Sequence, residues 1–279
     1  MKVFENKEDL KKYLQSQTSK TIGFVPTMGY LHEGHLSLVK ESKAYTDLTV
    51  VSIFVNPAQF NDPSDLEKYP RNEKRDLELL HTVNADVVYL PTVEDLYGKE
   101  IPKIQIQLPH LTNTLCGRTR PGHFEGVMLV IGRLFHIVSP NICYLGKKDY
   151  QQCRVIQEFA QALAFPTETR FVETVREPSG LAMSSRNSRL SEQGKEDALV
   201  ISKTLKLGEE LFHKGERDAN ALQEKLRDFF SKSKLTLDYL EIVSTKTLQP
   251  LKVLNEPFLV AIAGFAEGVR LIDNKEISL

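Results

Sequence analysis

Two apolar stretches with a helical pattern between them constrain the fold of this chain more than any other feature. Residues 21–25 and 46–55 are rich in aliphatic and β-branched side chains, which is typical of buried strands. Between them, the apolar residues of 31–39 recur at the spacing of one helix face. Pro26 has no N–H to donate, so we expect it to end the first strand. A strand, a helix and a second buried strand predict a βαβ unit and therefore a parallel sheet.

The residues that follow these two strands form the first candidate site. In open parallel sheets, ligands bind beyond the carboxyl ends of the strands. Thr27, Met28 and Gly29 follow the first strand, and Asn56 and Gln59 follow the second. We therefore expect both loops to face one crevice.

A pair of histidines lies at the start of the predicted helix. His32 and His35 are three residues apart, so their side chains point to one side of a helix. If the helix begins near Leu31, both imidazoles lie at its N-terminal end, where free N–H groups and the helix dipole favour an anion. This pattern predicts phosphoryl chemistry. The alternatives are two solvated surface residues or half of a metal site, although zinc would need a distant third ligand.

Composition and charge exclude several classes of protein. The 279 residues carry a formal net charge of -1, which argues against a broad nucleic-acid or membrane surface. The three cysteines occur singly and without a CxxC motif, which is typical of a reducing compartment. No apolar run approaches the roughly 18 residues that span a bilayer, and residues 1–9 lack the apolar core of a signal peptide. We therefore expect a cytoplasmic protein.

The remaining pattern predicts two domains. Further strands are predicted at 85–91, 141–145 and 169–176, with possible strand character at 104–106, and helices at 5–17, 73–83 and 127–138. Beyond residue 176 the pattern changes to two long amphipathic helices and three strands, at 191–214, 218–232, 235–243, 258–265 and 269–272. The predicted fold class is α/β, with a Rossmann-like parallel sheet in an N-terminal domain (1–176) and a smaller α+β C-terminal domain (177–279).

Three later loops are rich in polar side chains. Residues 116–126 hold Arg120 and His123, residues 146–152 hold Lys148 and Asp149, and residues 177–189 are dense in Ser and Arg. Lys, Arg, hydroxyl and backbone N–H groups are the usual donors to phosphate oxygens. The alternative is that these are solvated surface loops, with Lys148 and Asp149 forming an exposed pair of little consequence.

Taken together, these motifs resemble those of the pantothenate synthetase (pantoate–β-alanine ligase) family. The resemblance covers nearly the whole chain and rests on PTMG at 26–29, HEGH at 32–35, FVNPAQF at 54–60, YPR at 69–71, RPGHF at 120–124, GKKDYQQ at 146–152, VRE at 175–177 and MSSRN at 183–187. The HEGH motif is also similar to the HIGH signature of a wider nucleotidyltransferase superfamily, and residues 183–186 stand where that superfamily has its KMSKS loop. Lys147 departs from the family, which commonly has an acidic or neutral residue there.

The resemblance implies a two-step reaction. ATP and D-pantoate would form pantoyl adenylate and pyrophosphate, and the amine of β-alanine would then displace AMP. The resemblance also implies Mg²⁺ with the ATP phosphates, although its protein ligands are left open, and a homodimer. No partner nucleic acid or membrane is expected.

The family pattern assigns roles to particular residues. The expected catalytic residues are His35, His32, Lys148 and Arg186. The expected ATP-binding residues are Met28, Gly29, Tyr30, Leu31, His32, Glu33, Gly34, His35, Gly146, Lys147, Lys148, Asp149, Val175, Met183, Ser184, Ser185 and Arg186. The residues expected at pantoate or β-alanine are Gln59, Gln152, Asn56, Arg120 and His123.

Three alternative functions fit the pattern less well. An adenylyltransferase with a phosphorylated acceptor would need extra basic residues, whereas Gln59 and Gln152 suit an uncharged polyol end. A nucleotide-binding regulatory protein with a dead site is disfavoured by His32, His35, Lys148 and Arg186. A redox Rossmann enzyme is weaker still, because no G-x-G-x-x-G motif follows the first strand.

Overall fold

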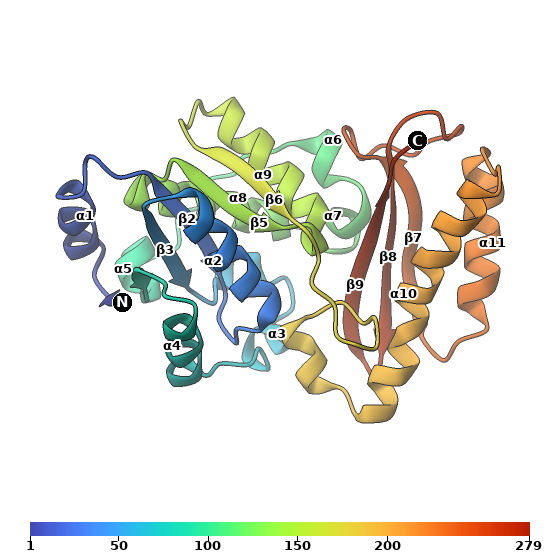
Figure 1. The fold of residues 1–279 in the computed structure, drawn as a ribbon, viewed down its shortest axis with the longest axis horizontal. Coiled ribbons are helices and arrows are strands. Elements are labelled where there is room, and N and C mark those ends of the chain that lie inside the picture. The colour runs from blue at the N-terminus through green and yellow to red at the C-terminus, as the bar shows by residue number, and fades with distance from the viewer. The chain divides into compact units, whose positions relative to one another are not determined.

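A computed structural model describes all of residues 1–279, which divide into two compact units (Figure 1). Unit 1 comprises residues 1–108, 120–147 and 152–173. Unit 2 comprises residues 109–119, 148–151 and 174–279. The two units are described separately below.

Unit 1 is built on a sheet of six parallel strands in the order β1-β4-β3-β2-β5-β6. The strands are β1 (Lys2–Phe4), β2 (Ile22–Thr27), β3 (Leu48–Ile53), β4 (Val87–Tyr89), β5 (Ile142–Gly146) and β6 (Glu168–Val172). β2 pairs with β3 along its whole length and with β5 at Gly23 and Phe24. Strand order reverses at β2, because β3 and β4 continue on one side and β5 and β6 on the other. Such a reversal is where open α/β sheets bind ligands.

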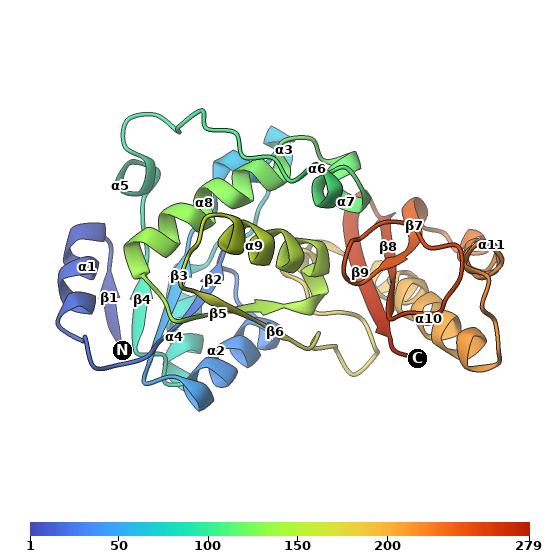
Figure 2. The ribbon, with the colours of Figure 1, turned by 90° about the horizontal axis from the view of Figure 1, so that it is seen from above.

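Helices cover both faces of this sheet, with α8 and α9 on one face and α2 and α4 on the other (Figure 2). The helices of the unit are α1 (Lys7–Gln15), α2 (Glu33–Tyr45), η1 (Pro57–Gln59), α3 (Pro63–Glu67), α4 (Glu73–Thr82), α5 (Val93–Tyr97), α8 (His123–Val138) and α9 (Tyr150–Ala162, within the unit from residue 152). Val25, Val51 and Val88 on neighbouring strands are fully buried beneath α2 and α4, in a core with Leu36 and Leu80. Burial on both faces explains why these strands read as continuous apolar runs.

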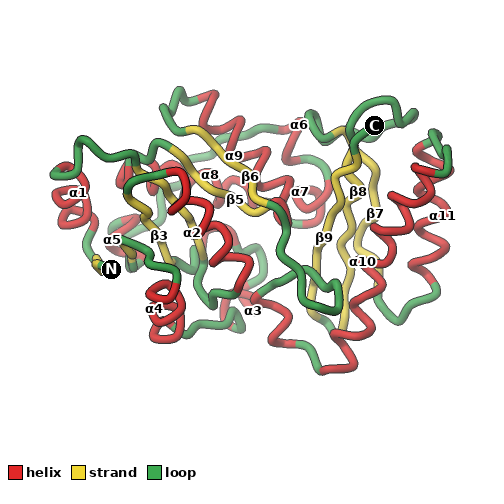
Figure 3. The backbone as a smooth tube through the Cα atoms, in the orientation of Figure 1, coloured by secondary structure: helices red, strands yellow, loops and turns green.

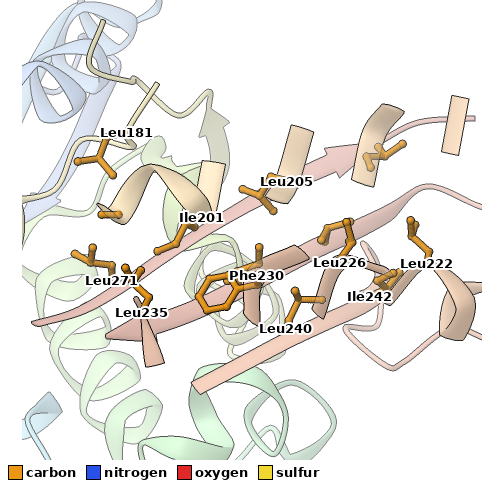
Figure 4. Close-up of a cluster of buried hydrophobic side chains, with 14 of the residues drawn as sticks. Leu181, Ile201, Leu205, Leu222, Leu226, Phe230, Leu235, Leu240, Ile242 and Leu271 are labelled. Carbon is orange, nitrogen blue, oxygen red and sulfur yellow. The ribbon is translucent and has the colours of Figure 1, made fainter. Parts of the chain in front are cut away.

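Unit 2 contains an antiparallel sheet, β7-β8-β9, and two long helices (Figure 3). Its elements are α6 (Pro109–Thr112), α7 (Leu115–Thr119), η2 (Lys147–Asp149, within the unit from residue 148), η3 (Ser185–Arg189), α10 (Glu192–His213), α11 (Ala219–Ser231), β7 (Thr236–Ser244), β8 (Phe258–Ala266) and β9 (Val269–Ile277). Leu205, Leu226 and Phe230 from the helices pack with Leu240 and Ile242 from β7 (Figure 4). The observed architecture confirms the predicted fold class, a Rossmann-like parallel sheet together with a smaller α+β part.

Some predicted details were wrong. Pro26 does not end β2, which continues to Thr27 with Pro26 opposite Ser52 of β3. β2 pairs with β5 only at Gly23 and Phe24. Pro26 therefore lies beyond this pairing, and its missing N–H removes no hydrogen bond to β5. Residues 104–106 form no strand. β1 was not predicted at all, because it is only three residues long and two of them are exposed. No helix is both long and apolar enough to cross a bilayer.

Candidate active site

The turn after β2 has an unusual backbone. Gly29 and Tyr30 both have positive φ angles, of 79° and 50°. A side chain at position 29 would be strained by that φ and would also lie 2.9 Å from Ile53 Cγ2, so glycine is required here. The Gly29 N–H donates to Thr27 Oγ1 at 3.2 Å. This tight turn reverses the chain directly before α2 begins.

His32 and His35 together cap the N-terminus of α2. His32 is the N-cap residue, and its Nδ1 accepts from the Gly34 N–H at 3.1 Å. His35 Nδ1 accepts from the His32 N–H at 3.3 Å, and the two rings lie 4.1 Å apart. Because each Nδ1 accepts a backbone hydrogen bond, each neutral imidazole carries its proton on Nε2. The prediction that both imidazoles lie at the start of this helix is confirmed, and both are Nε2–H donors.

Gln59 is held in one orientation by its neighbours. Tyr97 donates from its hydroxyl to Asn56 Oδ1 at 2.7 Å, and Asn56 Nδ2 donates to Gln59 Oε1 at 3.0 Å. Burial raises the pKa of Tyr97 above its ordinary value, so its hydroxyl stays protonated. Gln59 Nε2 is thereby the donor end of the amide, and it lies 3.2 Å from Met28 Sδ. Thioether sulfur is a weak acceptor, so this N–H₂ group is suited to a stronger acceptor such as a substrate oxygen.

Arg120 and His123 contact the backbone of Gln59. His123 is buried and donates from Nδ1 to the Gln59 carbonyl at 2.9 Å, which leaves Nε2 to accept from Arg120 Nη1 at 3.1 Å. Arg120 Nη2 also reaches the same carbonyl, at 3.5 Å. Gly126 in α8 packs so closely against η1 that an added Cβ would lie 2.2 Å from the Ala58 carbonyl oxygen. α8 therefore fixes the position of Gln59 through its backbone.

The carboxyl end of β5 lies next to that of β2 in the sheet. Gly146 ends β5, and its carbonyl accepts from Cys153 Sγ at 3.2 Å. Lys147 follows, and its ammonium group lies 2.5 Å from Glu173 Oε1. This ion pair offsets the positive charge of Lys147. Gln152 lies half-buried in the first turn of α9.

Other candidate residues belong to unit 2. Lys148 Nζ lies 3.7 Å from Asp149 Oδ1, and the Lys148 carbonyl accepts from Asn274 Nδ2 at 2.9 Å. The neighbouring residue of β9, Asp273, receives two hydrogen bonds from Arg176, at 2.6 and 3.0 Å. Two successive positions of β9 thus anchor the Lys148 segment and the start of the 177–189 loop.

The 177–189 loop is folded back on itself. The Met183 N–H donates to the Val175 carbonyl at 3.0 Å, which closes the loop at its base. Ser184 is the N-cap residue of η3, and its Oγ accepts from the Arg186 N–H at 3.3 Å. Ser185 is buried, whereas Arg186 is half-buried. Four of the expected ATP-binding residues, Met183 to Arg186, therefore follow one another on an ordered turn.

Sequence reasoning missed three polar residues that organise these sites. Tyr97 orients Asn56, Asp273 binds Arg176, and Asp76 binds the turn after β2. None stands in a motif, and each acts on a segment far away in the chain. The one available signal was Asp76 on the predicted helix 73–83. From sequence alone it could not be distinguished from an acidic side chain exposed to solvent. No group of three or more His, Cys, Asp or Glu side chains is placed to hold a metal ion.

Comparison with known proteins gives a consistent result. Residues 2–276 match the sequence profile of the family Pantoate-beta-alanine ligase. A pantothenate synthetase from Leptospira interrogans serogroup Icterohaemorrhagiae serovar Lai is 54% identical over 261 residues, covering 93% of this chain and 92% of its own. One from Pseudothermotoga lettingae is 47% identical over 276 residues, covering 98% of each chain.

Solved structures agree with these matches. A pantothenate synthetase from Thermus thermophilus superposes with a TM-score of 0.94 at 37% identity, covering 100% of both chains. A pantoate-beta-alanine ligase from Francisella tularensis, solved as a complex with beta-gamma ATP and beta-alanine, gives a TM-score of 0.82 at 34% identity and covers 99% of this chain and 97% of its own. The resemblance seen in the motifs is confirmed, and this chain belongs to the pantoate-beta-alanine ligase family.

Proposed function

We propose that this protein is an ATP-dependent ligase that condenses D-pantoate with β-alanine, giving pantothenate, AMP and pyrophosphate. Family membership over nearly the whole chain supports the reaction class. The observation that carries the proposal is the arrangement at the carboxyl ends of β2 and β3. Two imidazole Nε2–H donors at the start of α2 and the oriented amide of Gln59 occupy neighbouring loops there.

In the first step, a carboxylate oxygen of pantoate attacks the α-phosphorus of ATP and the bond to pyrophosphate breaks. Negative charge then grows on the phosphoryl oxygens and on the leaving group. We assign His32, His35, Lys148 and Arg186 to stabilise that charge as hydrogen-bond donors, with no covalent enzyme intermediate. We assign ATP contacts to the remaining residues of 28–35, 146–149 and 183–186 and to Val175.

In the second step, the amine of β-alanine attacks the acyl carbon of pantoyl adenylate, and AMP leaves as a proton is lost from nitrogen. Gln59 and Gln152 are proposed to bind the pantoyl group, with Gln59 also close to β-alanine. Gln59 donates through Nε2, because Asn56 already donates to its Oε1. Arg120 and His123 hold the Gln59 backbone and are therefore positioning residues in this proposal.

Three broader features belong to the same proposal. Mg²⁺ is expected to arrive with ATP, since it commonly retains waters and binds through substrate phosphates, and no cage of three or more acidic or His ligands is present. The protein is proposed to act in the cytoplasm. It is also proposed to form a homodimer, so its solution mass should be twice the 31.7 kDa of one chain.

Isotope exchange between pyrophosphate and ATP tests the reaction most directly. We expect exchange when D-pantoate is present and β-alanine is absent, because the first half-reaction is then reversible. Adding β-alanine should release AMP in equal amount to pantothenate. An enzyme that binds ATP but shows no pantoate-dependent exchange would contradict the proposal, and AMP retained in the product would indicate an adenylyltransferase.

A further inference from the structure

We propose that Asp76, together with its neighbour Arg75, is a positioning residue that holds the ATP-binding turn in its bound shape. Neither residue lies in a motif, and neither contacts a substrate in the proposed function. The inference rests on that proposed function only for the identity of the ligand. The claim about Asp76 itself concerns residues 29–32 and α4, all within unit 1.

Asp76 makes two short hydrogen bonds to this turn. Its Oδ2 accepts from the Tyr30 N–H at 2.7 Å, and its Oδ1 accepts from the Leu31 N–H at 2.7 Å. The carboxylate is only 1% exposed, so these bonds lie where water cannot replace them. The cost of burying an ionisable group is offset when it accepts from donors that would otherwise be unpaired.

Arg75 contacts the same turn. Its Nη1 donates to the Leu31 carbonyl at 2.9 Å, and its guanidinium lies 5.3 Å from the centre of the Tyr30 ring. It also lies 3.8 Å from Asp76 Oδ1, which partly balances the buried charge. Adjacent residues of α4 thus bind both the N–H and the carbonyl of Leu31.

These contacts act on the part of the turn that is strained. Tyr30 has a φ of 50°, in the left-handed region that non-glycine residues seldom adopt. Two backbone N–H groups donate to the one carboxylate of Asp76, which fixes the orientation of two successive peptide groups there. His32, the N-cap residue of α2, follows directly, so the positions of both imidazoles depend on this turn.

The same contacts change how an anion can bind. The N–H groups of Tyr30 and Leu31 point to Asp76 and are not available to a phosphate. The Gly29, Gly34 and His35 N–H groups also have partners within this segment. Phosphate recognition at α2 therefore depends on the imidazole side chains more than on backbone N–H groups, and their placement is what Asp76 controls.

Asp86, whose side chain is 29% exposed, offers a control in the same unit. It accepts from the Thr49 N–H at 2.8 Å and from Lys43 Nζ at 2.9 Å, so it also joins a carboxylate to the backbone of a neighbouring element. Asp86 lies at the amino ends of β3 and β4, the opposite edge of the sheet from the turn. A variant at this position measures the cost of losing such a carboxylate without touching the site.

The experiment compares Asp76→Asn and Asp86→Asn in the full chain. ATP binding is measured by calorimetry without pantoate, pyrophosphate exchange is measured at varied ATP and varied pantoate, and thermal unfolding is recorded for each variant. The amide introduced at position 76 places an N–H₂ group against one of the two backbone donors. We expect Asp76→Asn to weaken ATP binding by about tenfold to a hundredfold and to raise the KM for ATP far more than the KM for pantoate.

Asp86→Asn should lower the unfolding temperature while leaving both KM values and the ATP affinity unchanged. Folded Asp76→Asn that binds ATP as tightly as Asp86→Asn does would overturn the inference. If Asp76→Asn fails to fold, Arg75→Met provides the test. The Arg75 side chain is half-exposed, so its loss should be tolerated by the fold, and it still removes the hydrogen bond to the Leu31 carbonyl. Unchanged ATP affinity in Arg75→Met would then overturn the inference. Absence of pantoate-dependent exchange in the unmodified protein would count against the proposed function, while the calorimetric comparison would still test Asp76.

Discussion

At the scale of single residues, this protein uses side chains to fix the hydrogen-bonding role of other side chains. The two Nδ1 atoms of His32 and His35 accept backbone hydrogen bonds, so both rings present Nε2–H. Tyr97 and Asn56 do the same for Gln59, whose N–H₂ group becomes the donor end. These three side chains have their donor atoms set before substrate binds, which avoids reorganisation during the reaction.

His35→Ala should leave the fold intact and reduce the rate of adenylate formation by about a hundredfold or more. That is the size of effect expected for losing one proton donor or one donor to a developing oxyanion. Single-turnover formation of pyrophosphate measures the step. Near-normal turnover would remove His35 from the chemistry. Ser37→Ala, in the next turn of α2, is a control for the helix itself and should retain the rate.

Gln59→Ala should raise the KM for pantoate more than the KM for ATP. Tyr97→Phe should move both constants in the same direction by less. It removes one of two hydrogen bonds to the buried Asn56 Oδ1, which still accepts from the Ala58 N–H at 3.2 Å. One such hydrogen bond contributes about 0.5–1.5 kcal/mol. Steady-state kinetics with each substrate varied separates the two constants. An equal rise in both KM values for Gln59→Ala would contradict its assignment to pantoate.

At the scale of elements, short turns between strands and helices carry the placement of the site. Sequence patterning predicted most of these strands and helices, because the apolar residues of a doubly covered parallel strand or of an amphipathic helix follow a simple period. It missed β1, which pairs only with β4. Lys2 of β1 lies opposite Val87 of β4, which is 85 positions later in the chain. It also misjudged Pro26, because the effect of a missing N–H depends on which neighbour the strand is paired with.

The turn between β8 and β9 caps a helix, which gives a prediction about pH. Glu267 accepts from Ser191 Oγ and from the Ser191 N–H, at 2.5 and 2.9 Å, at the start of α10. The Ser191 hydroxyl bond, followed by the backbone bond, holds the pKa of Glu267 below its ordinary value of 4.5. A lowered pKa in the folded state means that the stabilisation is present above the unfolded pKa and is lost as pH falls through the folded pKa.

Glu267→Gln should therefore lower the unfolding temperature at neutral pH, and the difference from the unmodified protein should shrink below about pH 4.5. Thermal unfolding followed by circular dichroism across this pH range makes the comparison. Glu192→Gln, at an exposed position in the first turn of α10, should show a smaller difference. A gap between Glu267→Gln and the unmodified protein that stays constant through the acid range would exclude this role for Glu267.

At the scale of the whole molecule, the motifs located the candidate residues but not their supports. His32, His35 and Gln59 could be proposed from sequence because they stand at the ends of predicted strands, where a parallel sheet places its ligands. Asp76 and Tyr97 could not, because each contacts a segment more than 40 positions away and sits in a helix with an ordinary pattern. The assignment of the boundary between domains to residue 176 stays a prediction.

The order of strands in the parallel sheet has a consequence for synthesis on the ribosome. β2 is central in the sheet, yet one of its two partners is distant in the chain. Gly23 of β2 pairs with Ile142 of β5, which lies 119 positions later. Until residues 142–146 have been made, the nascent chain holds an apolar strand with one open edge, a form that pairs readily with other chains. Closing so distant a pair also makes folding slow. We expect this chain to depend on protection of that edge during translation. β2, the strand that leads into the histidine pair of α2, should be the strand most prone to misassembly.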